Sequence, residues 1–368
     1  MQHEQSEPLP SPTLPTDRRS MLAGIGGLAA GAFIAGKANA GPLTPPTGPI
    51  ASTPGPEPRI AINATNTPGD ANSVFRITQP GSYYLTDNIT GVAGRNGIEI
   101  VSSRVTLDLM GYALIGVPGS DNGINMNSFR DSVVIRNGHV FGWSGSGLKT
   151  RIDNGAVEGV HCYFNTGWGF DNNTSYSFRF SGCSALANGT ASAPTGGFRV
   201  GEATSVTDCQ ARNNAGPGFV LEGGSSISGC LAANNTDVGI TASFSGLIAD
   251  CTTKTNGRGG IEVGSNSLVR GNLCSSNSLG AFGFGVRIDG ADNRVEDNNC
   301  VGNRVGIDCT SAGNFIARNT CSGSTLVNWS IVAGNKCLVV NGANAGVISG
   351  DSGGTSPGST NPNANYTY

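Results

Sequence analysis

Charged side chains recur at one position of a short motif along the chain. The motif is a glycine followed by an apolar, a variable and usually a second apolar residue, as in GLKT at Gly147 and GFRV at Gly197. Alternate residues of a β-strand point to opposite faces, so the variable residue faces solvent when its neighbours face a core. The motif predicts one outward column, which consists of Glu99, Asn125, Lys149, Asp171, Arg199, Val220, Thr241, Glu262, Arg287 and Asp308.

Charged residues gather in and beside the first half of this column. Lys149, Asp171 and Arg199 are consecutive members, and Arg151 and Glu222 are expected on the same face two residues further along their strands. Lysine and arginine are suited to binding the carboxylates of an acidic sugar. We therefore assign Lys149, Asp171 and Arg199 as candidate catalytic residues, and Arg151 and Glu222 as candidate substrate-binding residues, of a cationic cluster. The alternative is a ladder of solvated ion pairs, each contributing about 0–1 kcal/mol.

A secondary, acidic cluster comprises Glu262, Arg287, Asp289 and Asp308. Glu262 and Asp308 are two steps apart, roughly 9–10 Å at the usual strand spacing, near the upper limit for the carboxyl pair of an inverting glycosidase. Arg287 lies between them, and a neighbouring cation is expected to lower a carboxyl pKa, whereas a general acid needs a raised one. The sequence therefore argues against a hydrolytic centre here.

Aromatic residues are concentrated near the cationic cluster. Trp143 and Trp168 are candidate substrate-binding residues, because exposed aromatic rings bind the flat apolar faces of sugars. Packing of these rings against the fold is the alternative. His139 and His161 are expected to stack, but no third ligand accompanies them, so we predict no metal site.

The elements that position these residues belong to one repeat. The glycine motif recurs every 21–28 residues, and a second mark, a ladder of cysteines, keeps a similar step. Each unit holds strands too short to bury an apolar face alone, whereas stacked units bury it and pair every strand with the coils above and below. We predict an all-β solenoid, a single-stranded parallel β-helix of about ten to eleven coils over residues 59–341.

The cysteines and asparagines of each unit have structural interpretations. Each cysteine ends an alternating stretch, which predicts a buried free thiol, because cysteine packs as a small hydrophobe. Disulfides between coils are the alternative, and the absence of a Cys-x-x-Cys motif argues against zinc. Asparagines follow the cysteines and are expected to stack at the turns: Asn165, Asn188, Asn213, Asn234, Asn256, Asn277 and Asn303.

The composition agrees with this interpretation. The 368 residues include 57 glycines, and only 13% are charged, so helices are disfavoured and short strands with many turns are favoured. The formal net charge of -3 and the scattered basic residues argue against nucleic-acid binding.

The N-terminal segment resembles an export signal. Arg18 and Arg19 precede a Gly/Ala-rich apolar run and a small-residue site ending at Ala40, as in a twin-arginine signal peptide. The run is shorter than the roughly twenty residues that cross a bilayer. We expect a signal over residues 1–40, read by the twin-arginine machinery, then a Pro-rich linker over residues 41–58. The mature chain, without a membrane span, would be periplasmic, cell-surface or extracellular, with a Gly/Ser/Asn-rich tail over residues 342–368.

The stretches FRITQPGSYYLTDNITG (Phe75 to Gly91) and VTLDLMGYALIG (Val105 to Gly116) resemble the right-handed parallel β-helix superfamily. The resemblance is to the exported bacterial branch, of unknown function, of this pectin-lyase-like group, and it covers about residues 59–368. It implies the fold, but the superfamily contains lyases, hydrolases, epimerases, tailspikes and adhesins. Of the polygalacturonase motifs only Asn-Thr-Asp at Asn235 is present; no adjacent Asp pair occurs.

The resemblance implies a polysaccharide or cell-surface glycan as partner. Cleavage by β-elimination would resemble pectate lyases, in which an arginine is the base and Ca²⁺ is held by carboxylates; only Asp171 and Asp153 are expected nearby. No other cofactor is implied. The alternative is a non-catalytic surface or envelope protein, a spacer or an adhesin.

Overall fold

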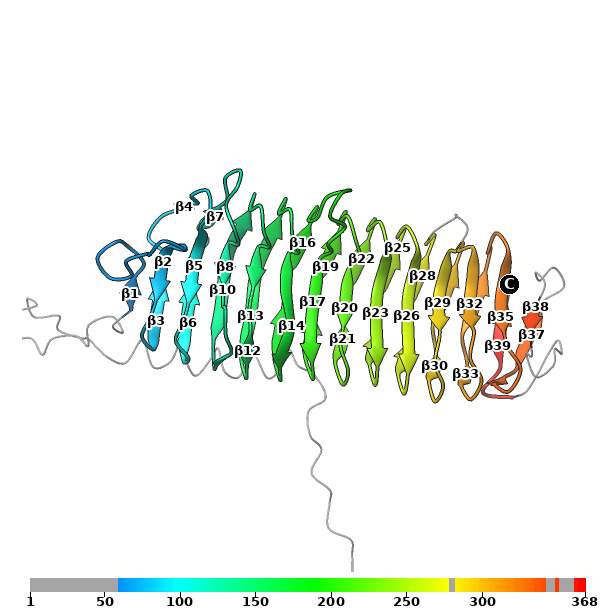
Figure 1. Ribbon diagram of the computed structural model, residues 1–368. Coiled ribbons are helices and arrows are strands. Elements are labelled where there is room, and N and C mark those ends of the chain that lie inside the picture. Colours follow the sequence, from blue (N-terminus) through cyan, green and yellow to red (C-terminus); the bar gives the residue numbers. More distant parts are fainter. Residues whose placement is uncertain (1–58, 278–281, 342–347, 351–360) are drawn as a thin grey trace, which may run out of the picture. The chain divides into compact units, whose positions relative to one another are not determined.

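In the computed structural model, the described residues from Arg59 onward form a parallel β-helix (Figure 1). The structure describes residues 59–277, 282–341, 348–350 and 361–368. Within these residues there is no helix, and all pairings between named strands are parallel. The predicted signal and linker, residues 1–58, lie outside the described residues.

Sheet B supplies one lateral face. Thirteen of its strands follow one another, one per coil. They are β2 (Ser73–Ile77), β5 (Asn96–Ile100), β8 (Ile124–Asn125), β11 (Leu148–Lys149), β14 (Phe170–Tyr176), β17 (Phe198–Glu202), β20 (Phe219–Leu221), β23 (Val238–Phe244), β26 (Gly259–Ser265), β29 (Phe284–Ile288), β32 (Val305–Cys309), β35 (Val327–Ile331) and β38 (Ile348–Gly350). Two short strands, β9 (Arg130–Asp131) and β12 (Ile152–Asp153), pair beside this path.

Sheet A contains the other strands and contributes two strands to most coils. It comprises β1 (Ile60–Ala61), β3 (Gly81–Tyr84), β4 (Ile89–Thr90), β6 (Val105–Asp108), β7 (Ala113–Ile115), β10 (Val134–Phe141), β13 (Ala156–Tyr163), β15 (Arg179–Ser181), β16 (Ser184–Leu186), β18 (Ser205–Thr207), β19 (Gln210–Arg212), β21 (Ser226–Ser228), β22 (Leu231–Ala233), β24 (Leu247–Ala249), β25 (Thr252–Lys254), β27 (Leu268–Arg270), β28 (Leu273–Ser275), β30 (Arg294–Glu296), β31 (Asn299–Val301), β33 (Phe315–Ala317), β34 (Thr320–Ser322), β36 (Lys336–Cys337), β37 (Val339–Asn341) and β39 (Asn365–Thr367).

The solenoid has about thirteen coils in the described residues, close to the ten to eleven predicted. The prediction counted the glycine motif, which marks ten strands of sheet B. The strands β2, β35 and β38 lack that motif but pair in the same sheet. Backbone pairing therefore extends beyond the ten glycine-marked coils, by one strand before them and by two strands after them.

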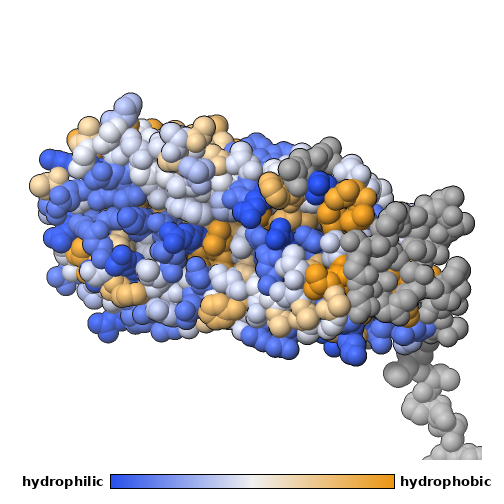
Figure 2. Space-filling view, turned by 45° about the vertical axis from the view of Figure 1, so that its right-hand side comes forward, coloured by the Kyte–Doolittle hydropathy of each residue, from blue (hydrophilic) through white to orange (hydrophobic). Residues whose placement is uncertain are grey.

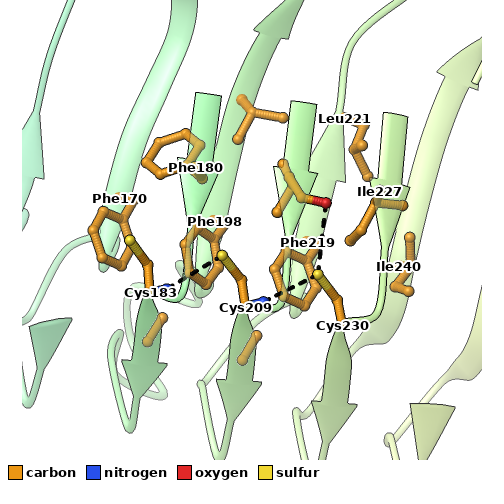
Figure 3. Close-up of a cluster of buried hydrophobic side chains, with 14 of the residues drawn as sticks. Phe170, Phe180, Cys183, Phe198, Cys209, Phe219, Leu221, Ile227, Cys230 and Ile240 are labelled. Atoms are coloured by element: carbon orange, nitrogen blue, oxygen red, sulfur yellow. Dashed lines mark hydrogen bonds between the residues drawn. The ribbon is translucent and has the colours of Figure 1, made fainter. Parts of the chain in front are cut away.

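The core is a set of inward columns. On sheet B, Phe170, Phe198 and Phe219 occupy the same position of successive coils and are buried. Their rings stack with centroids 4.5 and 4.7 Å apart (Figure 3). Stacking of like residues in like positions buries a face that no single coil could bury alone.

The cysteines confirm the predicted burial and correct the predicted ladder. All ten are free and buried. Cys183, Cys209, Cys230 and Cys251 form one column at the turn between the two sheet A strands (Figure 3). A second column, within the strands, holds Cys162, Cys274, Cys300 and Cys321 with small residues between the first two. The positions of the two columns are two residues apart within a coil. Cys162 and Cys183 are 21 residues apart, and Cys251 and Cys274 are 23 apart. Both spacings are close to the coil step, so in the sequence the two columns look like one ladder.

The asparagine ladder is present, with a shift of one residue at two coils. Each side chain except the last donates to the amide oxygen of the next, in the order Asn165, Asn188, Asn214, Asn235, Asn256, Asn277, Asn303. Each of the seven also donates to a backbone carbonyl. Asn213 and Asn234, which the sequence pattern indicated, each stand one residue before a ladder asparagine. Both adopt a positive φ angle of 55° in the turn. Asparagine tolerates this left-handed conformation better than most residues, so both members of each Asn-Asn pair have a role.

Two strands of the segment predicted as a tail pair with the solenoid. β38 pairs with β35, and β39 lies between β34 and β37. Asn365 accepts hydrogen bonds from the backbone and side chain of Asn319, and Trp329 donates to Thr367 at 2.6 Å. The C-terminal strand thus extends a core hydrogen-bond ladder.

Candidate functional site

The outward column of sheet B has the predicted register. Lys149 pairs with Asp171, and Asp171 pairs with Arg199 on the next coil. The remaining members pair in the order given by the motif, from Glu99 to Asp308. The β-helix therefore places the three candidate catalytic residues side by side on adjacent coils.

The cationic cluster surrounds a carboxylate that has lost much of its hydration. Asp171 is half-buried, and its Oδ1 is enclosed without a hydrogen-bond partner among the described residues. Burial raises the pKa of Asp171 above its ordinary value, although Arg199, Lys149 and Arg151 each act to lower it. Desolvation outweighs the three cations.

The cations of the cluster are not consumed by ion pairs. Lys149 is exposed, and Arg151 and Arg199 are half-buried. No salt bridge or hydrogen bond joins the side chain of any of the three to another part of the described chain. Their donors therefore remain available to a ligand. Glu222, by contrast, accepts a hydrogen bond of 3.4 Å from Ser243 on the following coil.

Trp143 was wrongly assigned as a substrate-binding residue. Its side chain is fully buried, and its Nε1 donates to the Leu114 carbonyl at 3.2 Å. The ring lies over Gly91 and Gly97, where a Cβ would come within 2.9 Å of it, so it fills the core space left by these glycines. Trp168 is half-buried beside Gly196, and its substrate-binding role stays a prediction.

Two carboxylates of the acidic cluster, Glu262 and Asp289, are paired with arginines. Arg287 Nε lies 2.8 Å from Asp289 Oδ1 and 3.9 Å from Glu262 Oε1, and Arg258 lies 4.0 Å from Glu262. Asp289 also accepts from Thr310, and the hydrogen bonds from Arg287 and Thr310 outweigh the effect of burial, so the Asp289 pKa is lowered.

The pKa of Glu262 differs from the expectation drawn from Arg287. Burial raises it, supported by the neighbouring Asp289, against the lowering effects of Arg258 and Arg287. The sequence shows that a cation is adjacent but not that only 17% of the Glu262 side chain is exposed. Asp308 is half-buried and in register with Arg287.

Phe129 and Tyr176 form an exposed aromatic pair that the sequence did not assign to the site. Their ring centroids lie 6.3 Å apart with an interplanar angle of 30°. Phe129 precedes the irregular strand β9, and Tyr176 follows a bulge in β14, so neither occupies a position of the glycine motif.

Asp171 and Asp153 are the carboxylates that the sequence places near a possible calcium site. No three His, Cys, Asp or Glu side chains within them are placed to hold a metal ion. Calcium takes about six to eight oxygen ligands, and Asp171 and Asp153 alone do not provide them. His139 and His161 do stack, with centroids 5.1 Å apart, on sheet A, where His161 Nδ1 is 2.7 Å from Ser184 Oγ.

The searched part of the chain contains no helix with the length and apolar character needed to cross a membrane. The face shown in Figure 2 is largely hydrophilic, with smaller apolar patches.

Comparisons with known proteins return similar structures only. No protein-family model matches the chain, and no curated protein matches it. The Dettilon tailspike protein is 17% identical with a TM-score of 0.39, over 74% of this chain and 61% of the tailspike chain, so this chain spans less than two thirds of that protein.

Two similar enzyme structures are a GH87 α-1,3-glucanase from Streptomyces thermodiastaticus and the AlgE6 A-module, a mannuronan C-5 epimerase of Azotobacter vinelandii. The glucanase is 15% identical with a TM-score of 0.44, over 83% of this chain and 70% of its own. The epimerase is 13% identical with a TM-score of 0.36, over 84% and 87%. At these values no residue role or activity is transferred to this chain.

Proposed function

We propose that this protein binds an acidic polysaccharide along sheet B, at the cationic cluster. The observation that carries the proposal is the set of three cations, Lys149, Arg151 and Arg199, around Asp171 without ion-pair partners of their own. Parallel strands space Lys149 and Arg199 roughly 10 Å apart along the stack. A row of donors on a regular lateral surface suits an extended polyanion. The proposal includes export, which rests on the signal-like residues 1–40.

Binding is tested with Lys149→Ala and Arg199→Ala against a panel of acidic and neutral polysaccharides. Each substitution removes charge-assisted hydrogen bonds and is expected to weaken acidic-polymer binding about tenfold. Arg212→Ala is the matched control, because Arg212 is exposed on sheet A without a salt bridge. Equal losses in all three variants would indicate nonspecific charge attraction, and no binding by the wild type would favour the spacer alternative.

A lyase reaction is a second candidate, favoured by the half-buried Asp171, whose pKa is raised by burial among three cations. In the proposed step Asp171 accepts the proton α to the sugar carboxylate, which Arg199 and Arg151 neutralise. The C–H electron pair forms the new C=C bond, the bond to the leaving oxygen breaks, and Lys149 supplies that oxygen with a proton. Water returns the proton from Asp171 to Lys149.

Cleavage is measured by the ultraviolet absorbance of new unsaturated ends on uronate polymers. The lyase proposal expects this absorbance with the wild type and its loss in Asp171→Asn. Binding without unsaturated ends would contradict the lyase and leave a non-catalytic binding protein.

A further inference from the structure

Phe129 and Tyr176 come from two coils of sheet B that are separated by one further coil, and they lie beside the cationic cluster. Arg130 is in register with Ile152, and Asp153 with Tyr176, so one coil separates the two rings. Coils two apart are roughly 10 Å apart, yet the ring centroids are 6.3 Å apart, so the rings lean toward each other over the intervening coil. Phe129 is 46% and Tyr176 48% exposed. The pair therefore leaves much of its apolar surface in water.

A bulge gives Tyr176 its position. Between the pairs Asn172–Val200 and Tyr176–Glu202, β14 advances four residues while β17 advances two. The side chains of Asn173 and Thr174, consecutive in this bulge, are both half-buried. Bulges next to functional sites redirect side chains, and this one lies between Asp171 and Tyr176, which are both in β14.

Polar atoms without partners surround the aromatic pair. Enclosed atoms without a hydrogen bond in the described residues include Arg130 Nε, Asp153 Oδ1 and Thr174 Oγ1, in addition to Asp171 Oδ1. Arg130 adjoins Phe129, and Asp153 is in register with Tyr176. The aromatic pair therefore lies among polar side chains on three successive coils.

We infer that Phe129 and Tyr176 form a sugar-stacking subsite of the lateral binding site. The inference rests on the proposed function. A pyranose ring offers an apolar face to the aromatic pair, and its hydroxyls can contact the accessible parts of the half-buried Arg130 and Asp153 beside the pair. Asp171 and Tyr176 are five residues apart, at most about 17 Å along an extended strand. The ligand is therefore an oligosaccharide with its acid group at the cationic cluster and another sugar ring on the aromatic pair.

The test compares three probes by calorimetry: trigalacturonate, the galacturonate monomer and tripolyphosphate. Phe129→Ala and Tyr176→Ala are expected to weaken trigalacturonate binding about tenfold each. Affinity for the monomer and for tripolyphosphate should not change, because neither places a sugar ring on the pair while bound at the cations. Tyr176→Phe should retain binding. Phe164→Ala is the control, since Phe164 is 62% exposed on the sheet A side.

The outcomes separate this inference from the proposed function. Trigalacturonate binding that depends on Lys149 and Arg199 but not on Phe129 or Tyr176 would overturn the aromatic subsite alone. Equal losses for trigalacturonate and tripolyphosphate would also overturn it, because a phosphate chain has no ring face. A wild type that binds no trigalacturonate would remove both. Unchanged melting temperatures of the variants establish that folding is intact.

Discussion

Asp171 is the residue on which the chemistry of the site depends. Its carboxylate lies among three cations, but burial dominates and raises its pKa. An acid whose folded pKa is raised stabilises the fold at pH values below its unfolded pKa, and this contribution is lost as pH rises through the folded pKa. The ionised carboxylate also opposes the binding of a polyanion. Asparagine does not ionise, so both the pH dependence of stability and the opposition to polyanion binding should be absent in Asp171→Asn.

We expect the affinity of the wild type for acidic oligosaccharide to rise as pH falls from neutral through the Asp171 pKa, while the sugar stays ionised. Protonation removes one negative charge from the cluster. Asp171→Asn should bind several-fold more tightly at neutral pH and show a flat profile, without loss of stability. Calorimetric titration across this pH range measures both. Weaker binding by Asp171→Asn would show that the carboxylate itself accepts hydrogen bonds from the ligand.

At this scale the sequence predicted which residues share a face but not their environments. Alternation and the glycine motif are enough to place Lys149, Asp171 and Arg199 on one column. Burial is a tertiary property, so Trp143 was assigned to the surface and the Glu262 pKa shift was assigned the wrong direction. Phe129 carries no periodic signal, because it lies beside an irregular strand.

The turns are the elements that keep the coils in register. Asn235 is buried, accepts from Asn214, and donates to Asn256 at 3.0 Å and to the Ala211 carbonyl at 3.0 Å. Removing a buried amide in such a ladder leaves several backbone and side-chain groups unpaired, each at a cost.

Asn235→Ala is expected to lower the free energy of unfolding by about 2–4 kcal/mol. The adjacent Asn234→Ala should cost about 1 kcal/mol, because Asn234 is exposed and contributes mainly its positive φ. Urea unfolding of both variants provides the comparison. Equal shifts would mean that the ladder does not stabilise the turn.

The cysteine columns predict a thiol count. Burial raises the pKa of the Cys162 thiol well above its ordinary value, and all ten cysteines are buried and free. We expect negligible reaction with a thiol reagent in the native protein and ten reactive thiols after denaturation without reductant. A lower count in the denatured protein would reveal disulfides between coils.

At the scale of the elements, the sequence predicted that cysteines and asparagines stack in columns. It did not predict which residue of each coil joins a column. Cysteine and asparagine recur with nearly the coil step, so their stacking was predictable. Coils of unequal length permit more than one alignment, and only backbone pairing distinguishes Asn214 from Asn213 or separates the two cysteine columns.

For the whole molecule, the stack behaves as a one-dimensional array in which each coil contacts its neighbours. The C-terminal strand β39 is an exception in sequence order, because it lies between β34 and β37 after a long connection. Its pairing with β34 was not predictable, since the composition of residues 342–368 resembles a linker and Asn319 and Asn365, which the pairing joins, are 46 residues apart.

Deletion of residues 361–368 should destabilise only the C-terminal coils. It removes the partners of Asn319 and Trp329, so amide exchange should accelerate in β34, β35 and β37. Exchange in β2 to β20 should stay unchanged, because nearest-neighbour coupling limits the spread of the effect. Acceleration throughout the chain would contradict this one-dimensional behaviour.

The most direct test is a crystal structure of the protein with a bound acidic oligosaccharide. The proposal predicts a sugar carboxylate within hydrogen-bond distance of Lys149, Arg151 or Arg199, with the chain lying against sheet B. An oligosaccharide bound only elsewhere, for example on the sheet A aromatics around Tyr163, would contradict it.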